Sequence, residues 1–309
     1  MQHHALKISV IGAAGRVGSA TAFALVMRGL AEELVLIDRT TDAVTGDAYD
    51  LRHAAAFVRP MDIRAGCLDA SAGSDIIIVC ASAPVSDTSS RLTQAAPNAA
   101  LFRQIIPSVA AASPDTILLI VSNPVDVMTH VALRLSGFPP ARVFGTGTLI
   151  DTARFRALLS HASGMNSDDI RAYIVGEHGD SQLPALSVAS AGGVRFPEHD
   201  ATVLELFEQA RRGGYEVVAH KKYTNYAIAA ATSVIVEAIA RNTLSVLPVS
   251  VLVDGYLGVD DVCLSMPCVI GRAGVVRMLH IDLSPDEQEA FVRSAASLRG
   301  VTAAIGAHA

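Results

Sequence analysis

The stretch KISVIGAAGRVG, residues 7–18, decides the fold. Its first part, Lys7–Ile11, is an apolar run of strand length, and three glycines spaced as GxxGxxG follow it. Glycines in this arrangement permit a tight turn, a close approach of the backbone to a pyrophosphate, and close packing of a helix on the strand. The helix predicted at residues 15–28 would point its N-terminal N–H groups at the phosphates. The stretch therefore predicts the first strand, turn and helix of a dinucleotide-binding unit.

The next predicted strand, residues 33–38, ends in Asp38, twenty residues after Gly18. A carboxylate there can hydrogen-bond the adenosine ribose and repels a 2′-phosphate, which favours NAD over NADP. Arg39 beside it favours the opposite choice. The cofactor is predicted to be NAD. The residues assigned to it are Gly12, Gly15, Arg16, Val17, Gly18, Asp38, Asn98 and Val121.

Buried strands alternate with helices through the first half of the chain. Continuous apolar runs at residues 75–80 and 116–121 predict two further strands. Helices are predicted at residues 41–53, 97–112 and 124–136. This alternation indicates an α/β fold with a doubly wound parallel sheet of the Rossmann type.

The second half has a different pattern. β-branched residues and Gly-Asp turns at residues 246–281 predict an antiparallel meander, so an α+β catalytic domain with an antiparallel sheet is expected. The boundary is predicted near residue 148, with a NAD-binding domain at 1–148 and a catalytic domain at 149–309. The other predicted elements are a helix at 150–163, a strand at 171–175, mostly helical structure at 202–231 and a closing helix at Pro285–Ala304.

Composition excludes several classes of protein. The 309 residues are 51% apolar and 17% charged, which supports a large core and argues against disorder. A formal net charge of −6 without a long basic run argues against nucleic acid as a partner. The apolar runs are too short to cross a membrane, so a cytoplasmic protein without membrane contact is expected. The four cysteines form no CxxC pair and the histidines lack metal-ligand spacing, so reduced cysteines and no metal site are expected.

Four later segments carry polar groups in apolar surroundings. Reduction of a 2-keto acid needs a cation for the substrate carboxylate, a proton donor for the carbonyl oxygen, and a partner that keeps the donor protonated. Histidine is the natural donor near neutral pH, a carboxylate beside it favours its protonated form, and arginine presents a planar fork to a carboxylate. The segments that supply these groups are SRL (90–92), SNPVD (122–126), DTARFR (151–156) and GEHGD (176–180).

With these segments, the chain resembles the lactate/malate dehydrogenase family over nearly its whole length. GEHGD after DTAR is the most specific part of the match, and the glycine turn and KYT (222–224) add to it. The resemblance implies a NAD-dependent dehydrogenase that interconverts an L-2-hydroxy acid and its 2-keto acid. It implies His178 as the acid/base, Asp151 as its partner, and Arg91 as a loop residue that polarises the carbonyl. The residues implied for substrate binding are Arg154, Asn123 and Thr224.

Structural explanations of single residues stay open. Asn123 is also explained as a turn residue before Pro124, Thr224 as a helix surface residue, and Arg91 as a solvated loop charge. A NAD-binding module that has lost catalysis is the alternative from another functional class, although the intact set of polar residues argues against it.

The chain departs from the family at Val85, six residues before Arg91. Lactate dehydrogenases usually carry Gln there, and malate dehydrogenases carry Arg. Valine offers no partner to a distal substrate carboxylate, whose burial unpaired costs several kcal/mol, and Asp87 would repel one. The predicted substrate is therefore a 2-keto acid with a larger, uncharged, apolar side chain that Val85 contacts. A malate or lactate dehydrogenase proper is the alternative.

A homodimer or homotetramer is also expected. Residues 46–53 resemble the helix that forms the dimer contact in the family, and its face at Ala48, Leu51 and Ala55 is apolar. Arg156 and Arg171 match positions where some relatives bind a phosphate-bearing effector between subunits.

Overall fold

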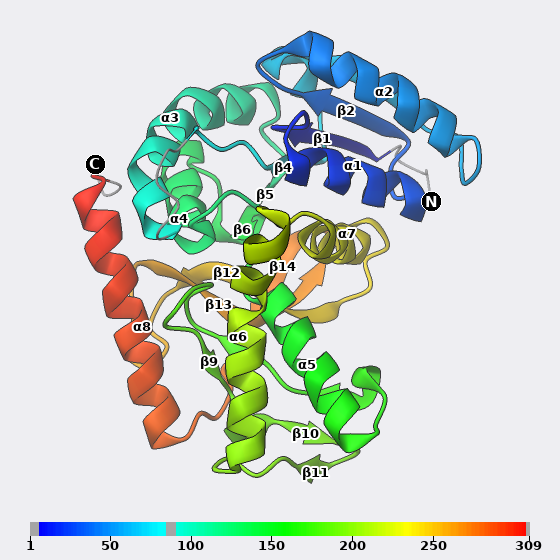
Figure 1. Cartoon of the computed structure of the whole chain (residues 1–309). Coiled ribbons are helices and arrows are strands. Elements are labelled where there is room, and N and C mark those ends of the chain that lie inside the picture. Colours follow the sequence, from blue (N-terminus) through cyan, green and yellow to red (C-terminus); the bar gives the residue numbers. More distant parts are fainter. Residues whose placement is uncertain (1–5, 85–90, 307–309) are drawn as a thin grey trace.

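In the computed structural model, which describes residues 6–84 and 91–306, a nine-stranded sheet runs through the molecule (Figure 1). Its strand order is β14-β13-β12-β6-β5-β4-β1-β2-β3. The strands are β1 (Lys7–Ile11), β2 (Glu33–Ile37), β3 (Asp62–Gly66), β4 (Ile76–Val79), β5 (Ile117–Ile120), β6 (Val143–Gly145), β12 (Ser245–Val253), β13 (Val262–Gly271) and β14 (Gly274–Met278).

Eight α-helices accompany the sheet in the described part of the chain. Helices α1 and α2 contact each other, as do α3 and α4, and α5 packs on α6. The helices are α1 (Arg16–Arg28), α2 (Thr41–Ala55), α3 (Ala95–Ala112), α4 (Val125–Ser136), α5 (Leu149–Ser163), α6 (Ala201–Lys221), α7 (Tyr226–Ala240) and α8 (Pro285–Ala304).

The first six strands are all parallel, and their order confirms the doubly wound sheet. The chain runs outward from β1 to β3, returns, and then runs from β4 to β6 on the other side of β1. Every residue of β4 and β5 is buried, as expected of parallel strands covered on both faces. The order reverses between β1 and β4, and ligands of open α/β sheets bind at the carboxyl ends of strands at such a point.

The antiparallel meander is also confirmed, and it extends the same sheet. β12, β13 and β14 pair antiparallel, and β12 joins the parallel part where Ser250 pairs with Gly145 of β6. Two small sheets complete the second half, β11-β10-β7 and β8-β9. Their strands are β7 (Ile170–Arg171), β8 (Ile174–Val175), β9 (Leu183–Pro184), β10 (Ser190–Ala191) and β11 (Val194–Arg195).

Several predicted elements differ from the structure. Two strands of the large sheet were not predicted: β3, an edge strand with the charged residues Asp62 and Arg64, and β6, which is only three residues long. The two-residue strands β9, β10 and β11 of the small sheets were not predicted either. The strand predicted at 171–175 is two short strands in different sheets, because β7 pairs with β10 and β8 pairs with β9. The helical structure predicted to end at residue 231 continues in α7 to Ala240.

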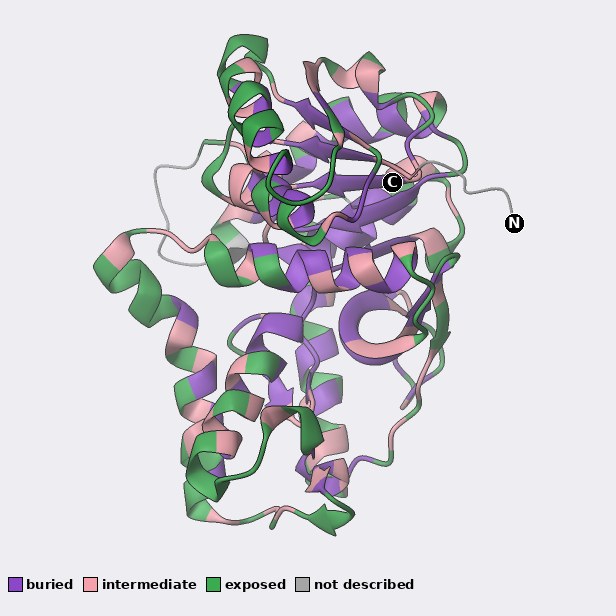
Figure 2. Ribbon diagram, turned by 90° about the vertical axis from the view of Figure 1, so that its right-hand side faces the viewer, coloured by how far each residue is buried: buried purple, intermediate pink, exposed green. Residues whose placement is uncertain are grey.

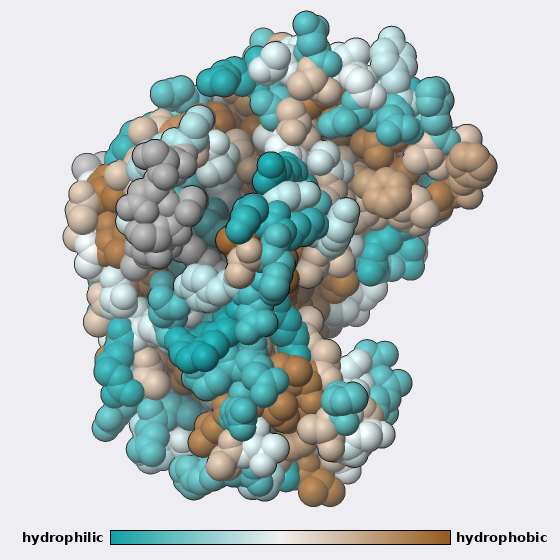
Figure 3. All heavy atoms as spheres, viewed as in Figure 1, coloured by the Kyte–Doolittle hydropathy of each residue, from teal (hydrophilic) through white to brown (hydrophobic). Residues whose placement is uncertain are grey.

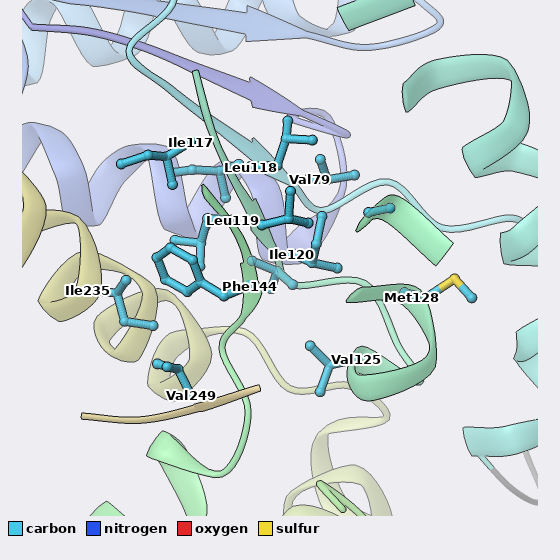
Figure 4. Close-up of a cluster of buried hydrophobic side chains, with 14 of the residues drawn as sticks. Val79, Ile117, Leu118, Leu119, Ile120, Val125, Met128, Phe144, Ile235 and Val249 are labelled. Atoms are coloured by element: carbon cyan, nitrogen blue, oxygen red, sulfur yellow. The ribbon is translucent and has the colours of Figure 1, made fainter. Parts of the chain in front are cut away.

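A hydrophobic core lies between the sheet and its helices and crosses the predicted boundary at residue 148. Figure 4 shows part of it, where Phe144 of β6 lies among side chains of β5, α7 and β12, including Ile235 and Val249. Figure 2 shows the strands buried beneath helices whose outer sides are exposed. The division at residue 148 stays a proposal, since strand pairing and core packing both continue across it.

The apolar face of α2 does not have the role expected of it. Ala48, Leu51 and Ala55 are buried within the chain's own core, so they are not available to a second subunit. The exposed apolar side chains near them are Tyr49, Phe57 and Val58. Among the helices of the described residues, none is both long and apolar enough to cross a membrane.

Candidate active site

Three side chains, from α5 and from the turn after β8, form a hydrogen-bonded group. His178 Nδ1 lies 2.5 Å from Asp151 Oδ2, and Arg154 Nη1 donates to Asp151 Oδ1 at 3.2 Å. The Asp151 side chain is only 1% exposed, whereas His178 is 11% and Arg154 21% exposed. The buried carboxylate thus binds one nitrogen-bearing side chain with each oxygen, and both of those side chains reach the surface of the site.

Two threonines fix α5 against β8. The Thr148 hydroxyl donates to the carbonyl of Ile174 at 2.5 Å, and the Ile174 N–H donates to the Thr152 hydroxyl at 2.9 Å. Both backbone groups of one strand residue are therefore held by the first turns of the helix that carries Asp151. This arrangement sets the position of the helix relative to the turn that carries His178, three residues after the last residue of β8.

The turn itself is held by its backbone. The N–H groups of Gly176, Glu177 and His178 each donate to a different element. Their acceptors are the Ser265 carbonyl of β13 at 3.0 Å, the Ser294 hydroxyl of α8 at 2.9 Å and Asp126 Oδ2 of α4 at 2.7 Å. The three acceptor residues, Ser265, Ser294 and Asp126, are additions to the predicted site. Asp126 was inside the SNPVD segment, but no pattern in the sequence indicated Ser265 or Ser294.

A glycine of α6 makes room for Arg154. A Cβ atom on Gly213 would lie 3.2 Å from Arg154 Cδ and 3.4 Å from its Nε. The arginine therefore packs directly on the helix backbone at this residue. Glycine inside a helix costs about 1 kcal/mol relative to alanine, so its use here is explained by this contact. The contact was not predicted from the sequence.

The glycine turn fits a dinucleotide. Gly12 has φ +83°, and a Cβ there would lie 2.6 Å from Ala81 N, at the point where the strand order reverses. A Cβ on Gly18 would collide with the Gly12 carbonyl. Gly15 is the N-cap of α1, which has no side-chain cap and no acidic residue in its first turn, so its N–H groups suit a phosphate. The turn thus leaves backbone, not side chains, facing the predicted pyrophosphate.

Asp38 lies beside this turn, and its predicted contact with the ribose stays a prediction. It follows β2, and its carboxylate receives the Ala14 N–H at 3.0 Å and the Arg39 N–H at 2.7 Å. The carboxylate is therefore fixed next to the glycine turn, where a ribose hydroxyl can reach it.

Arg16 links the turn to the second half of the chain. Its guanidinium lies 3.9 Å from the centre of the Tyr223 ring, in the loop between α6 and α7. Thr224 is half-buried in the same loop, outside any helix, which removes its explanation as a helix surface residue. Val17 is half-buried and packs against the main core.

The loops after β4 and β5 meet at Asn98. Its buried side chain accepts the Ala83 N–H at 2.7 Å and donates to the Asn123 carbonyl at 2.6 Å. Asn98 therefore joins the two loops beside the cofactor turn, and contact with the cofactor stays a prediction. Val121 is buried directly after β5. Asn123 Oδ1 is buried without a hydrogen-bond partner among the described residues, which suits an atom reserved for a ligand.

The remaining predicted residues are placed in part. Arg91 begins a 3-10 turn (Arg91–Gln94), but its side chain lies outside the described part, and so does Val85. Arg156 donates to the Ala172 carbonyl at 2.8 Å and stacks on Tyr173, while Arg171 donates to the Asp168 carbonyl at 2.6 Å. Within residues 6–84 and 91–306, no group of three or more potential metal ligands occurs.

Comparison with known proteins follows this geometry. The lactate/malate dehydrogenase NAD binding domain matches residues 6–145, and the lactate/malate dehydrogenase alpha/beta C-terminal domain matches residues 148–307. The chain belongs to the lactate/malate dehydrogenase family. An L-lactate dehydrogenase of Gloeobacter violaceus is 42% identical over 303 residues, which cover 95% of this chain and 92% of the relative. L-lactate dehydrogenases of Clostridium perfringens and Clostridium botulinum are each 41% identical, with 95% of both chains covered.

Membership of this family settles the class of reaction. This family member is a NAD-dependent dehydrogenase of L-2-hydroxy acids, and its first half carries the NAD-binding domain. The catalytically silent module is thereby set aside.

We expect Gly213→Ala to raise the KM for the keto acid about tenfold, because the added methyl group displaces Arg154 by a few tenths of an ångström. Turnover should fall less than KM rises, and the melting temperature should not fall, since alanine favours the helix. Steady-state kinetics measure KM and turnover, and thermal unfolding measures the melting temperature. Gly300→Ala in α8 is the matched control, because nothing lies within 4 Å of its added Cβ. An unchanged KM in Gly213→Ala would mean that Arg154 does not bind the substrate carboxylate.

Proposed function

We propose that this dehydrogenase reduces a 2-keto acid with an uncharged, apolar side chain, using His178 as the proton donor. The observation that carries the assignment of roles is the group formed by His178, Asp151 and Arg154, with its two contacts of 2.5 and 3.2 Å. It supports the proposed roles, because a histidine, a buried carboxylate and an arginine lie together in it.

The three side chains have separate tasks. Asp151 holds the Nδ1 side of the imidazole, so Nε2 is the nitrogen that gives its proton to the carbonyl oxygen. The negative charge of Asp151 favours the protonated ring. Arg154 binds the substrate carboxylate and, because it also contacts Asp151, fixes the distance between the substrate anchor and the proton donor. Arg91 polarises the carbonyl from the loop that carries it.

The residues of the first half would hold the cofactor. The glycine turn and the first turn of α1 would bind the pyrophosphate, and Asp38 the adenosine ribose. The bound cofactor would supply the hydride that the carbonyl carbon receives. Asn123 Oδ1, buried and without a partner among the described residues, would orient the substrate and the nicotinamide, and Thr224 would line the pocket.

Two kinds of keto acid are candidate substrates. Val85 favours a larger apolar side chain, because valine cannot pair with a second carboxylate and leaves a methyl group poorly contacted. The names of the relatives, all L-lactate dehydrogenases, favour pyruvate as the second candidate. Oxidation of NADH by a panel of pyruvate, oxaloacetate, 2-oxobutyrate and 4-methyl-2-oxopentanoate separates them by kcat/KM.

We expect His178→Asn to lower turnover by a factor of roughly 10² to 10⁴ while NADH binding changes little. The reason is that the asparagine amide keeps a hydrogen-bond donor near Asp151 but cannot deliver a proton. Single-turnover kinetics and NADH fluorescence titration measure the two effects. His161→Asn, at an exposed position near the end of the same α5 helix, is the matched control. Near-normal turnover in His178→Asn would remove this residue from the reaction.

We expect Val85→Arg to raise kcat/KM for oxaloacetate, relative to an uncharged keto acid, by about two orders of magnitude. In a site without water, arginine can pair bidentately with the distal carboxylate. Asp87 can pair with the new arginine and reduce the gain, so Val85→Arg with Asp87→Ser is the cleaner variant. A change of the ratio below about threefold in both variants would show that residue 85 does not face the substrate.

We also propose that the protein is a homodimer or homotetramer. Apolar side chains are exposed over α1 and α2, at the right of Figure 3. They are Phe23 and Met27 of α1, Tyr49 of α2, and Phe57 and Val58 just after α2; Phe57 is 91% exposed. This patch replaces the buried face of α2 as the proposed contact. Sedimentation velocity at micromolar concentration should show a dimer or larger species, and Phe57→Glu should shift it towards monomer. A wild-type protein that sediments only as monomer would contradict the proposal.

A further inference from the structure

A second carboxylate, that of Asp126, lies next to the proposed acid/base histidine. Asp126 is in the first turn of α4, and 2% of it is exposed. Its Oδ2 accepts the backbone N–H of His178 at 2.7 Å. The two carboxylates therefore hold the histidine at different places, Asp151 at the ring and Asp126 at the backbone.

The ionised carboxylate of Asp126 does not make the folded chain more stable. Burial raises its pKa from 3.8 to about 6, although the Ser250 hydroxyl, the His178 N–H and the charge of His178 favour the ionised form. Because the pKa is higher in the folded chain than in the unfolded chain, folding becomes less favourable as pH rises from about 4 to about 6. Above pH 6 a neutral side chain of the same shape would serve the fold better.

The charges of Asp126 and His178 act on each other, since the charge of His178 favours the ionised form of Asp126. Asp151 shares its charge between His178 and Arg154, whereas His178 is the cationic group whose charge acts on Asp126 within the described part of the chain. The other titratable groups that face Asp126 are Glu177, which opposes its ionisation, and Cys263 of β13. The Cys263 thiol is buried, and its pKa lies well above the ordinary value, so it stays neutral.

We propose that Asp126 is a positioning residue for His178: it fixes the turn through the His178 N–H, and its negative charge favours the protonated imidazole. This inference rests on the proposed function, since it concerns the residue assigned there as proton donor. It adds a second source of negative charge to the site. It also makes α4, which follows the cofactor-side strand β5, a support for the proton donor of the second half.

Asp126→Asn tests the charge separately from the hydrogen bond, because the asparagine oxygen can still accept the His178 N–H. The single-turnover rate of NADH oxidation at pH 8, with the best keto acid of the panel, should fall about tenfold. The alkaline limb of the pH profile should move by about one pH unit to lower pH, since the protonated imidazole loses a stabilising charge. The melting temperature should not fall, and NADH binding should stay within about twofold.

Ser294→Ala is the comparison variant, because it removes the neighbouring uncharged hydrogen bond to the Glu177 N–H. It should leave the alkaline limb in place. If both variants move the limb equally, or if Asp126→Asn moves neither limb nor rate, the proposal is wrong.

Ser250→Ala keeps the test decisive if Asp126→Asn fails to fold. Loss of the Ser250 hydroxyl disfavours the ionised Asp126, so the acid limb of the profile should move to higher pH; an unmoved acid limb would contradict the proposal. The His178→Asn variant distinguishes a failure of the proposed function from a failure of the proposal for Asp126. Full activity in His178→Asn defeats the proposed function, whereas an inactive His178→Asn beside a normal Asp126→Asn defeats only this one.

Discussion

The buried carboxylate of Asp151 is the constraint on which the catalytic half depends. An unpaired charge at 1% exposure would cost several kcal/mol, so each oxygen needs a donor. The chain supplies one from the same helix, Arg154, and one from a turn 27 residues away, His178. The contact between Asp151 and Arg154 requires only a helix, because the two residues are spaced i, i+3. The hydrogen bond to His178 requires α5 and β8 to keep a fixed relative position. The hydrogen bonds of Thr148 and Thr152 to Ile174 fix that position.

The junction between β6 and β12 imposes a second constraint, on α4. A Cβ on Gly145 would collide with Thr129 Oγ1 and lie 2.7 Å from Val125 Cγ2, both on α4, so the helix packs against bare backbone. A Cβ on Gly147 would lie 2.5 Å from Ser250 N. This close packing brings the first turn of α4 near the strands of the second half. Asp126 can reach the turn of His178 only because of it.

The elements that depend on local residue patterns were predicted from the sequence, whereas the contacts between distant segments were not. The glycine turn, the buried strands and the closing helix follow from residue patterns along a few turns or strands, and the structure has them. β6 was missed because three residues carry no periodicity, and β3 because an edge strand with Asp62 lacks a continuous apolar run. His178 and Asp151 were found through motif resemblance. Ser265 and Ser294 could not be found, since a serine hydroxyl or a backbone carbonyl gains its role only from what folding brings beside it.

The distribution of these contacts explains how one site can keep its chemistry while its substrate changes. The N–H groups of three successive residues in the catalytic turn bind β13, α8 and α4, and its imidazole binds α5. Donors and acceptors held from four elements are preorganised, so little reorganisation is needed as the proton moves. The acceptors in these contacts are the backbone carbonyl of Ser265 and the buried side chains of Ser294, Asp126 and Asp151. Val85 is outside the described residues, and we propose that a change there alters which keto acid is recognised. The four hydrogen bonds that hold His178 all join other, described residues. Under this proposal, substrate recognition can change at residue 85 while the hydrogen bonds around Asp151 and Asp126 hold His178 in place.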